Sequence, residues 1–170
     1  PPPPAGAPAA AYLSLGSNLG DRRRALAFAR GQLAATPGVT LDAASPVYET
    51  APHGTPGPQP DYLNQVVRVI TTLAPGVLLH RCLEIENRHG RVRPSRHAPR
   101  TLDIDLLLHG DAVCDTPFLT LPHPRMRERA FVLVPLADIA PGLSVNGIPV
   151  ARLLRGLDVE TVRPAPAEGG

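Results

Sequence analysis

Apolar residues recur every three to four positions in two long segments, a spacing typical of helices that bury one face. The first segment spans residues 21–35, with Leu26, Ala29 and Leu33 on the face expected to be buried. The second spans residues 75–90 and carries apolar residues at the same spacing. The pattern therefore predicts two amphipathic helices.

Residues that start and stop helices lie at the ends of both segments. Asp21 is a plausible N-cap, and Thr36-Pro37-Gly38 is expected to stop the first helix. Pro75 suits the first turn of the second helix, and Gly90 is the expected C-cap.

The remaining apolar segments in the first two thirds of the chain read as strands. They span residues 10–15, 39–49, 62–72 and 99–108, and Pro46 implies an edge or a bulge in the second. The order is strand, helix, strand, strand, helix, strand. The predicted fold class is therefore α+β, a ferredoxin-like βαββαβ antiparallel sheet with helices on one face.

A C-terminal extension follows the sixth element. Its pattern predicts a helical stretch at 124–136, a turn at Asn146-Gly147 and a helix at 149–154. No internal repeat or second domain is evident.

Composition supports one globular domain. The chain has 170 residues, of which 43% are hydrophobic, enough to build a core. We expect a flexible leader at 1–9, a single domain at 10–161 and a flexible tail at 162–170. No apolar run reaches the length of a membrane span, and the leader does not resemble a signal peptide. We expect a cytoplasmic monomer that binds no membrane.

Charge and cysteine content narrow the function classes. The net charge of +2 is too small to indicate a nucleic-acid-binding protein. The chain has no lysine, which excludes a Walker phosphate loop and a kinase strand lysine. Cys82 and Cys114 are the only cysteines, and we expect both to be buried free thiols.

An acidic pair marks the last predicted strand. Because side chains alternate along a strand, Asp103 and Asp105 share one face, while Leu102, Ile104 and Leu106 share the other. Neighbouring carboxylates repel each other unless cations lie between them, and Mg²⁺ prefers such oxygen ligands beside substrate phosphates. The alternative is an acidic pair on a solvated strand face.

Other polar residues offer ligands for phosphate and for a flat heterocycle. Four arginines precede the acidic strand: Arg91, Arg93, Arg96 and Arg100. They are either a triphosphate clamp or a solvated basic loop. His123, fixed between two prolines, is either structural or a phosphate contact. Asn64 can donate to and accept from the edge of a heterocycle, or it is a polar residue at the edge of the core.

Six segments, in this order, resemble the hydroxymethyl-dihydropterin pyrophosphokinase family of the folate pathway. They are Gly16-Ser17-Asn18-Leu19, Tyr48-Glu49-Thr50, Asp61-Tyr62-Leu63-Asn64, Gly90-Arg91-Val92-Arg93, Pro99-Arg100-Thr101-Leu102-Asp103-Ile104-Asp105, and Pro122-His123-Pro124-Arg125-Met126 through Phe131-Val132-Leu133. The resemblance runs from about Ala11 to Leu157. Each segment alone is weak evidence, but six in order are specific.

The resemblance implies a function and a set of site residues. It implies Mg²⁺-dependent transfer of the pyrophosphoryl group of ATP to the hydroxymethyl of a reduced pterin, releasing AMP. Asp103 and Asp105 match the pair that bridges two Mg²⁺ ions. The positions expected to meet the triphosphate are Arg91, Arg93, Arg100, His123 and Arg129. Those around the pterin or its supporting shell are Thr50, Tyr62, Asn64, Glu86 and Phe131. Leu106 and Thr120 match positions near the adenine.

The chain also departs from the family pattern. Familiar members carry a tryptophan where this chain has His97, whose smaller ring would cover less of the pterin. Pro94 stands where a basic residue is frequent, and Ala51 replaces a frequent proline. Two rival readings are a nucleotide-binding regulatory module without turnover and an RNA-binding ferredoxin-like domain. The latter would need aromatic residues on the sheet, which are scarce here.

Overall fold

The computed structural model describes residues 6–51, 60–91 and 101–166, and the side chain of Arg91 lies outside this description. Its centre is a six-stranded sheet in which every pair is antiparallel. The strands are β1 (Ala9–Ser17), β2 (Val39–Ala44), β3 (Tyr48–Thr50), β4 (Tyr62–Thr71), β5 (Asp103–His109) and β10 (Arg163–Pro164). The order is β10-β3-β4-β1-β5, and β2 also pairs with β4.

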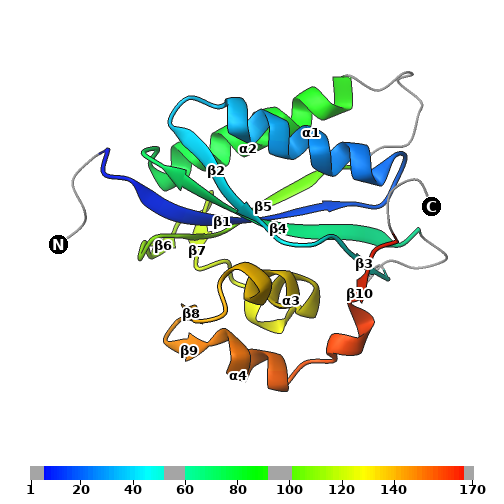
Figure 1. The fold of residues 1–170 in the computed structure, drawn as a ribbon. Helices are drawn as coiled ribbons and strands as arrows, with labels where there is room; N and C mark the ends of the chain where they lie inside the picture. The colour runs from blue at the N-terminus through cyan, green and yellow to red at the C-terminus, as the bar shows by residue number, and fades with distance from the viewer. Residues whose placement is uncertain (1–5, 52–59, 92–100, 167–170) are drawn as a thin grey trace.

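Helices α1 (Arg22–Ala35) and α2 (Pro75–Arg91) cover one face of the sheet (Figure 1). The predicted buried face of α1 is confirmed, since Leu26, Ala29 and Leu33 are fully buried. The cap is confirmed as well, because the Asp21 carboxylate accepts a hydrogen bond from the Arg24 N–H at 3.1 Å. Ile104 and Leu106 of β5 join the core beneath these helices.

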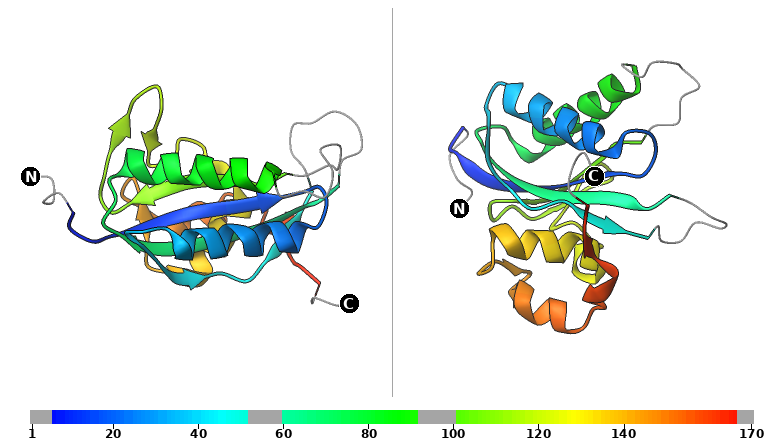
Figure 2. Two further views of the ribbon diagram at one scale, coloured as in Figure 1. Left: turned by 90° about the horizontal axis from the view of Figure 1, so that it is seen from above. Right: turned by 45° about the vertical axis from the view of Figure 1, so that its right-hand side comes forward.

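Helices α3 (Ala130–Ile139) and α4 (Val150–Arg155) lie on the opposite face of the sheet (Figures 1 and 2). A second core forms there, in which Val132, Leu133 and Leu136 of α3 pack with Val66 and Leu107 of the sheet. The two helices of the predicted βαββαβ unit thus share one face, and the C-terminal extension, whose position was not predicted, covers the other (Figure 1). Burial on both faces explains why β1 and β4 read as nearly continuous apolar runs.

Short elements connect these layers. They are β6 (Cys114–Asp115), β7 (Thr120–Leu121), the 3-10 turn η1 (Met126–Glu128), β8 (Ser144–Val145), β9 (Ile148–Pro149) and the 3-10 turn η2 (Val159–Thr161). The turn at Asn146-Gly147 is confirmed: both residues have positive φ, 52° and 80°, and they join β8 to β9. The helix predicted at 149–154 is α4.

Several boundaries differ from prediction. The strand predicted at 39–49 is two strands, β2 and β3, separated at Pro46. Gly90 is not a C-cap, because α2 continues through it to Arg91. The helix predicted at 124–136 is instead η1 followed by α3.

Two further predictions, for the C-terminal segment and for the cysteines, are only partly confirmed. Residues 163–164 were expected in a flexible tail but form β10, which pairs with β3. Both cysteines are free; Cys82 is buried, as predicted, whereas Cys114 is only partly so. Within the described ranges, no helix is long and apolar enough to cross a bilayer.

Candidate active site

A row of residues crosses the sheet where strands β5, β1 and β4 run side by side. Asp103 pairs with Gly16, and Gly16 pairs with Asn64 on its other side. A Cβ on Gly16 would lie 3.4 Å from Asn64 Oδ1 and 3.7 Å from the Tyr62 ring. The missing side chain therefore leaves an open floor between the carboxylate and the amide.

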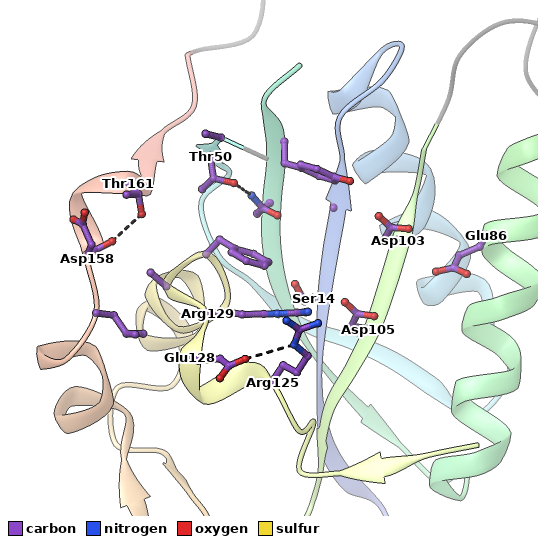
Figure 3. Close-up of a pocket in the computed structure, with 17 residues that line it drawn as sticks. Ser14, Thr50, Glu86, Asp103, Asp105, Arg125, Glu128, Arg129, Asp158 and Thr161 are labelled. Atoms are coloured by element: carbon purple, nitrogen blue, oxygen red, sulfur yellow. Dashed lines mark hydrogen bonds and ion pairs between the residues drawn. The ribbon is translucent and has the colours of Figure 1, made fainter. Parts of the chain in front are cut away.

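This floor belongs to a cavity of about 1100 Å³ on the α3 side of the sheet (Figure 3). The cavity is lined by Ser14, Gly16, Thr50, Ala51, Tyr62, Asn64, Glu86, Asp103, Asp105, Arg125, Glu128, Arg129, Ala130, Phe131, Leu157, Asp158 and Thr161. Strands supply the floor, while the η1–α3 segment and the chain after α4 supply the opposite wall.

One end of the cavity is acidic. Asp103 and Asp105 extend into it from β5, and Glu86 approaches from α2 (Figure 3). The Glu86 carboxylate accepts a hydrogen bond from the Ile104 N–H at 2.7 Å, which satisfies a donor on this edge strand. Burial and the neighbouring carboxylates raise the pKa of Asp103 and of Glu86. A cation bound among these carboxylates would relieve their mutual repulsion.

The middle of the cavity combines a fixed amide with aromatic rings. Asn64 Nδ2 donates to Thr50 Oγ1 at 2.6 Å, and both residues are buried. This bond fixes the orientation of the amide toward the cavity. Burial, and secondarily the charge of Asp103, raises the pKa of Tyr62. Phe131 lines the cavity from α3.

The opposite wall supplies positive charge. Arg125, just before η1, and Arg129, just before α3, reach toward Ser14 and Asp105 (Figure 3). The Arg129 guanidinium lies 5.5 Å from the centre of the Phe131 ring, a cation–π distance. Arg125 is also within 3.5 Å of Glu128. The wall can therefore meet an anion that approaches the carboxylates.

A second cavity of about 240 Å³ adjoins the first. It is lined by Leu79, Ile104, Asp105, Leu106, Thr116, Pro117, Phe118, Leu119, Thr120, His123 and Pro124. Asp105 lines both cavities, so a ligand occupying the two would pass this carboxylate.

His123 lines the second cavity. Its Nδ1 accepts a hydrogen bond from the Arg125 N–H at 3.2 Å, which leaves the proton of a neutral ring on Nε2. Burial lowers the pKa of His123. The lowered pKa favours the neutral ring, which can donate a hydrogen bond through Nε2.

The structure brings most of the predicted site residues together. The large cavity contains Thr50, Tyr62, Asn64, Glu86, Asp103, Asp105, Arg129 and Phe131, and the small one contains Leu106, Thr120 and His123. The side chain of Arg91 and the whole of Arg93, His97 and Arg100 lie outside the described residues.

Some lining residues were not predicted. Arg125 and Glu128 lie in the basic segment after His123, where the spacing to Arg129 was an available signal. Leu157, Asp158 and Thr161 carry no motif, and only the return of the chain to β3 brings them to the cavity.

The ligands available at the acidic end of the cavity suit Mg²⁺ better than a metal ion whose ligands all come from protein side chains. Among the described residues, no group of three or more His, Cys, Asp or Glu side chains is placed to hold a metal. Asp103 and Asp105 supply only carboxylate oxygens from one strand face, with positive side chains opposite. Mg²⁺ commonly binds one or two carboxylates and completes its shell with water and phosphate oxygens.

Comparison with known proteins agrees with this geometry. Residues 12–141 match the family model described as 7,8-dihydro-6-hydroxymethylpterin-pyrophosphokinase (HPPK). A Methylorubrum extorquens protein named 2-amino-4-hydroxy-6-hydroxymethyldihydropteridine pyrophosphokinase is 49% identical over 148 residues, covering 87% of this chain and 93% of its own length. A Pseudomonas aeruginosa protein of the same name is 42% identical over 156 residues, covering 91% and 96%.

Solved structures share the fold. A Plasmodium falciparum HPPK-DHPS crystal structure superposes with a TM-score of 0.68 at 16% identity, covering 88% of this chain. This chain spans 42% of the length of that one. The chain therefore belongs to the 7,8-dihydro-6-hydroxymethylpterin-pyrophosphokinase family and is a transferase.

Proposed function

We propose that the chain transfers the β,γ-pyrophosphoryl group of ATP to the hydroxymethyl of 6-hydroxymethyl-7,8-dihydropterin and releases AMP, a step in folate biosynthesis. The observation that carries the proposal is the position of Asp105, which lines both the large cavity and the small one. The pterin can occupy part of the large cavity and the base of the nucleotide the small one, with the transferred group at the carboxylate between them. The names of the relatives support the same substrate.

The large cavity suits a reduced pterin. Asn64, held by Thr50, presents an amide edge that can pair with the donors and acceptors of the heterocycle. Phe131 can stack on one face of the ring, and Tyr62 and Glu86 complete the surroundings. We expect His97 near the other face, in the segment outside the described residues.

The triphosphate would lie between the acidic strand and the basic wall. Asp103 and Asp105 would hold two Mg²⁺ ions, which when bound neutralise phosphate charge and lower the pKa of the attacking hydroxyl. Arg129 and His123 Nε2 would donate to phosphate oxygens, and Arg91, Arg93 and Arg100 are expected to add to this clamp. Leu106 and Thr120 would contact the adenine.

The protein would act by positioning and by electrostatics. The hydroxymethyl oxygen must meet the β-phosphorus in line with the departing AMP oxygen, so both substrates must be fixed. Asn64 and Phe131 would orient the pterin, while Arg129 and His123 would orient the phosphates and stabilise developing charge. We assign neither a nucleophilic residue nor a dedicated general base.

The scaffold supports this reading. The order β5-β1-β4, followed by β2 and β3, is the one expected of a ferredoxin-like βαββαβ unit, to which α3 and α4 add a second layer. We also propose that the protein is cytoplasmic and acts as a monomer, the latter because residues of one chain suffice to line both cavities.

Product analysis tests the proposal. The protein is mixed with ATP, Mg²⁺ and reduced hydroxymethylpterin, and nucleotides are separated by chromatography. We expect AMP and pterin pyrophosphate in equal amounts. ADP as the only nucleotide product would indicate γ-phosphoryl transfer instead, and nucleotide binding without product would favour a regulatory module.

A further inference from the structure

Phe118 is the most exposed large hydrophobic side chain among the described residues, with 88% of its surface accessible. A single exposed apolar residue is ordinary on a protein surface. Phe118, however, lies in the turn between β6 and β7 and lines the 240 Å³ cavity. The ring is thus exposed at the edge of a concave site.

Hydrogen bonds hold this turn in place. The Thr116 N–H donates to the Leu119 carbonyl at 3.0 Å. Thr116 Oγ1 accepts from the N–H of Phe118 at 3.3 Å and from that of Leu119 at 3.0 Å. The backbone that carries Phe118 is therefore ordered before any ligand binds, which lowers the entropic cost of using its ring.

The other walls of the cavity suit a flat ring. Leu79, Ile104 and Leu106 supply apolar surface, while Thr120 adds a polar group. The volume is below the usual range for a whole small-molecule ligand, so one heterocycle fits better than a complete nucleotide. Asp105 lies where the small cavity adjoins the large one.

We propose that Phe118 is an aromatic platform that stacks on the nucleobase of the nucleotide donor. The inference rests on the proposed function, since it takes the occupant of this cavity to be a nucleotide. Every base offers a π-face, so stacking on Phe118 raises affinity for the base without selecting among bases.

Equilibrium binding to matched ligands tests the inference. Calorimetry with Mg²⁺ compares a nonhydrolysable ATP analogue with tripolyphosphate, which has no base. Phe118→Ala should weaken binding of the ATP analogue about tenfold and leave tripolyphosphate binding unchanged. Phe118→Tyr should restore wild-type affinity because it retains the ring.

Val113 offers a matched control. It precedes the same hairpin and is 82% exposed, yet it lines neither cavity. Val113→Ala should bind both ligands as the wild type does. Equal weakening in the two alanine variants would overturn the inference, since general loss of apolar surface would then explain it.

A spectroscopic test is available because the chain contains no tryptophan. Phe118→Trp introduces a single indole, whose fluorescence should be quenched saturably by the ATP analogue and not by tripolyphosphate. Quenching by neither ligand, with the ATP analogue shown to bind, would contradict stacking.

Failure of this inference is distinguishable from failure of the proposed function. AMP formation together with wild-type ATP affinity in Phe118→Ala would refute only the platform. The opposite outcome is that the wild type forms no AMP, while Phe118→Ala loses affinity for the ATP analogue but not for tripolyphosphate. That outcome would refute only the reaction.

Discussion

Asp105 lines both cavities, and we propose for its carboxylate a role that an isosteric amide cannot fill. Asp105→Asn keeps the shape of the side chain and removes the charge proposed to hold Mg²⁺. We expect turnover to fall by about 10³ or more, since the electrostatic stabilisation of the transferring group is lost. Steady-state AMP formation measures the effect.

Asp111, in the exposed turn after β5, provides the control. Asp111→Asn should keep wild-type activity, and both variants should unfold at temperatures close to that of the wild type. Turnover of Asp105→Asn within a few-fold of wild type would defeat the metal assignment.

The two cysteines differ in environment and should differ in reactivity. Burial, together with the charges of Glu86 and Asp105, raises the pKa of Cys82 to about 12. Only roughly one in ten thousand of these thiols is ionised at pH 8, and the thiolate is the reactive form. Native iodoacetamide treatment should therefore label the partly exposed Cys114 first, as peptide mass spectrometry would show.

The reactivity of Cys82 should change with pH in one direction only. Cys82 should stay unreactive in the folded protein as pH rises, until pH approaches its raised pKa or the protein unfolds. Labelling of Cys82 at the rate of Cys114 below pH 9 would show that the helix α2 packing is open.

At the scale of elements, the stability of helix α1 depends on the cap at its first turn. The Asp21 carboxylate satisfies the Arg24 N–H, one of the donors that a helix start leaves unpaired. Asp21→Ala should lower the free energy of unfolding by about 1 kcal/mol. Asp21→Asn should lose much less, because an amide oxygen caps equally well. Urea denaturation measures both, and equal losses would argue against the cap.

Features set by neighbouring residues, such as helix caps and turns, could be predicted from the sequence. Boundaries set by contacts with distant parts of the chain were predicted less well. The cap at Asp21 and the turn at Asn146-Gly147 follow from local chemistry, and both are confirmed. Gly90 was predicted to end α2, but an isolated glycine only weakens a helix, and packing carries α2 past it. Pro46 correctly indicated an interruption, though not two separate strands.

At the scale of the whole molecule, the sequence pattern left open what covers the second face of the sheet. Helix α3 is apolar on most sides because it lies between the sheet and α4. The available signal was the lack of alternation in β4, where Val66 and Val67 enter opposite cores. A βαββαβ pattern does not say what covers the second face, so only three-dimensional packing resolves it.

The sequence likewise predicts the site residues that lie in motifs, but not those that only the packing of the chain brings to the cavity. Motifs that resemble the family identified residues in both cavities, including Asn64, Asp105 and Phe131. The wall formed by Leu157 and Thr161 could not be found in this way, because its position depends on where β10 joins the sheet.

Strand β10 holds this wall to the rest of the molecule. The Arg163 guanidinium lies 3.0 Å from the Asp61 carboxylate, and the Ala165 N–H donates to the Val47 carbonyl at 3.0 Å. Deleting residues 162–170 should lower the melting temperature by several degrees and raise KM for the pterin, since the wall loosens. The affinity for ATP should change little, because none of the deleted residues lines the small cavity.

Thermal denaturation and steady-state kinetics measure these effects, and deletion of residues 167–170 alone is the control. A shortened protein that matches the full chain in melting temperature and pterin KM would show that β10 contributes nothing to the site.

Asp103 and Asp105 are proposed to hold divalent cations against a triphosphate beside the pterin. A crystal structure with a nonhydrolysable ATP analogue, Mg²⁺ and reduced hydroxymethylpterin tests it most directly. We predict cation density at both carboxylates, the pterin against Asn64 and Phe131, and the base in the small cavity. Both ligands bound with no cation at either carboxylate would contradict the account.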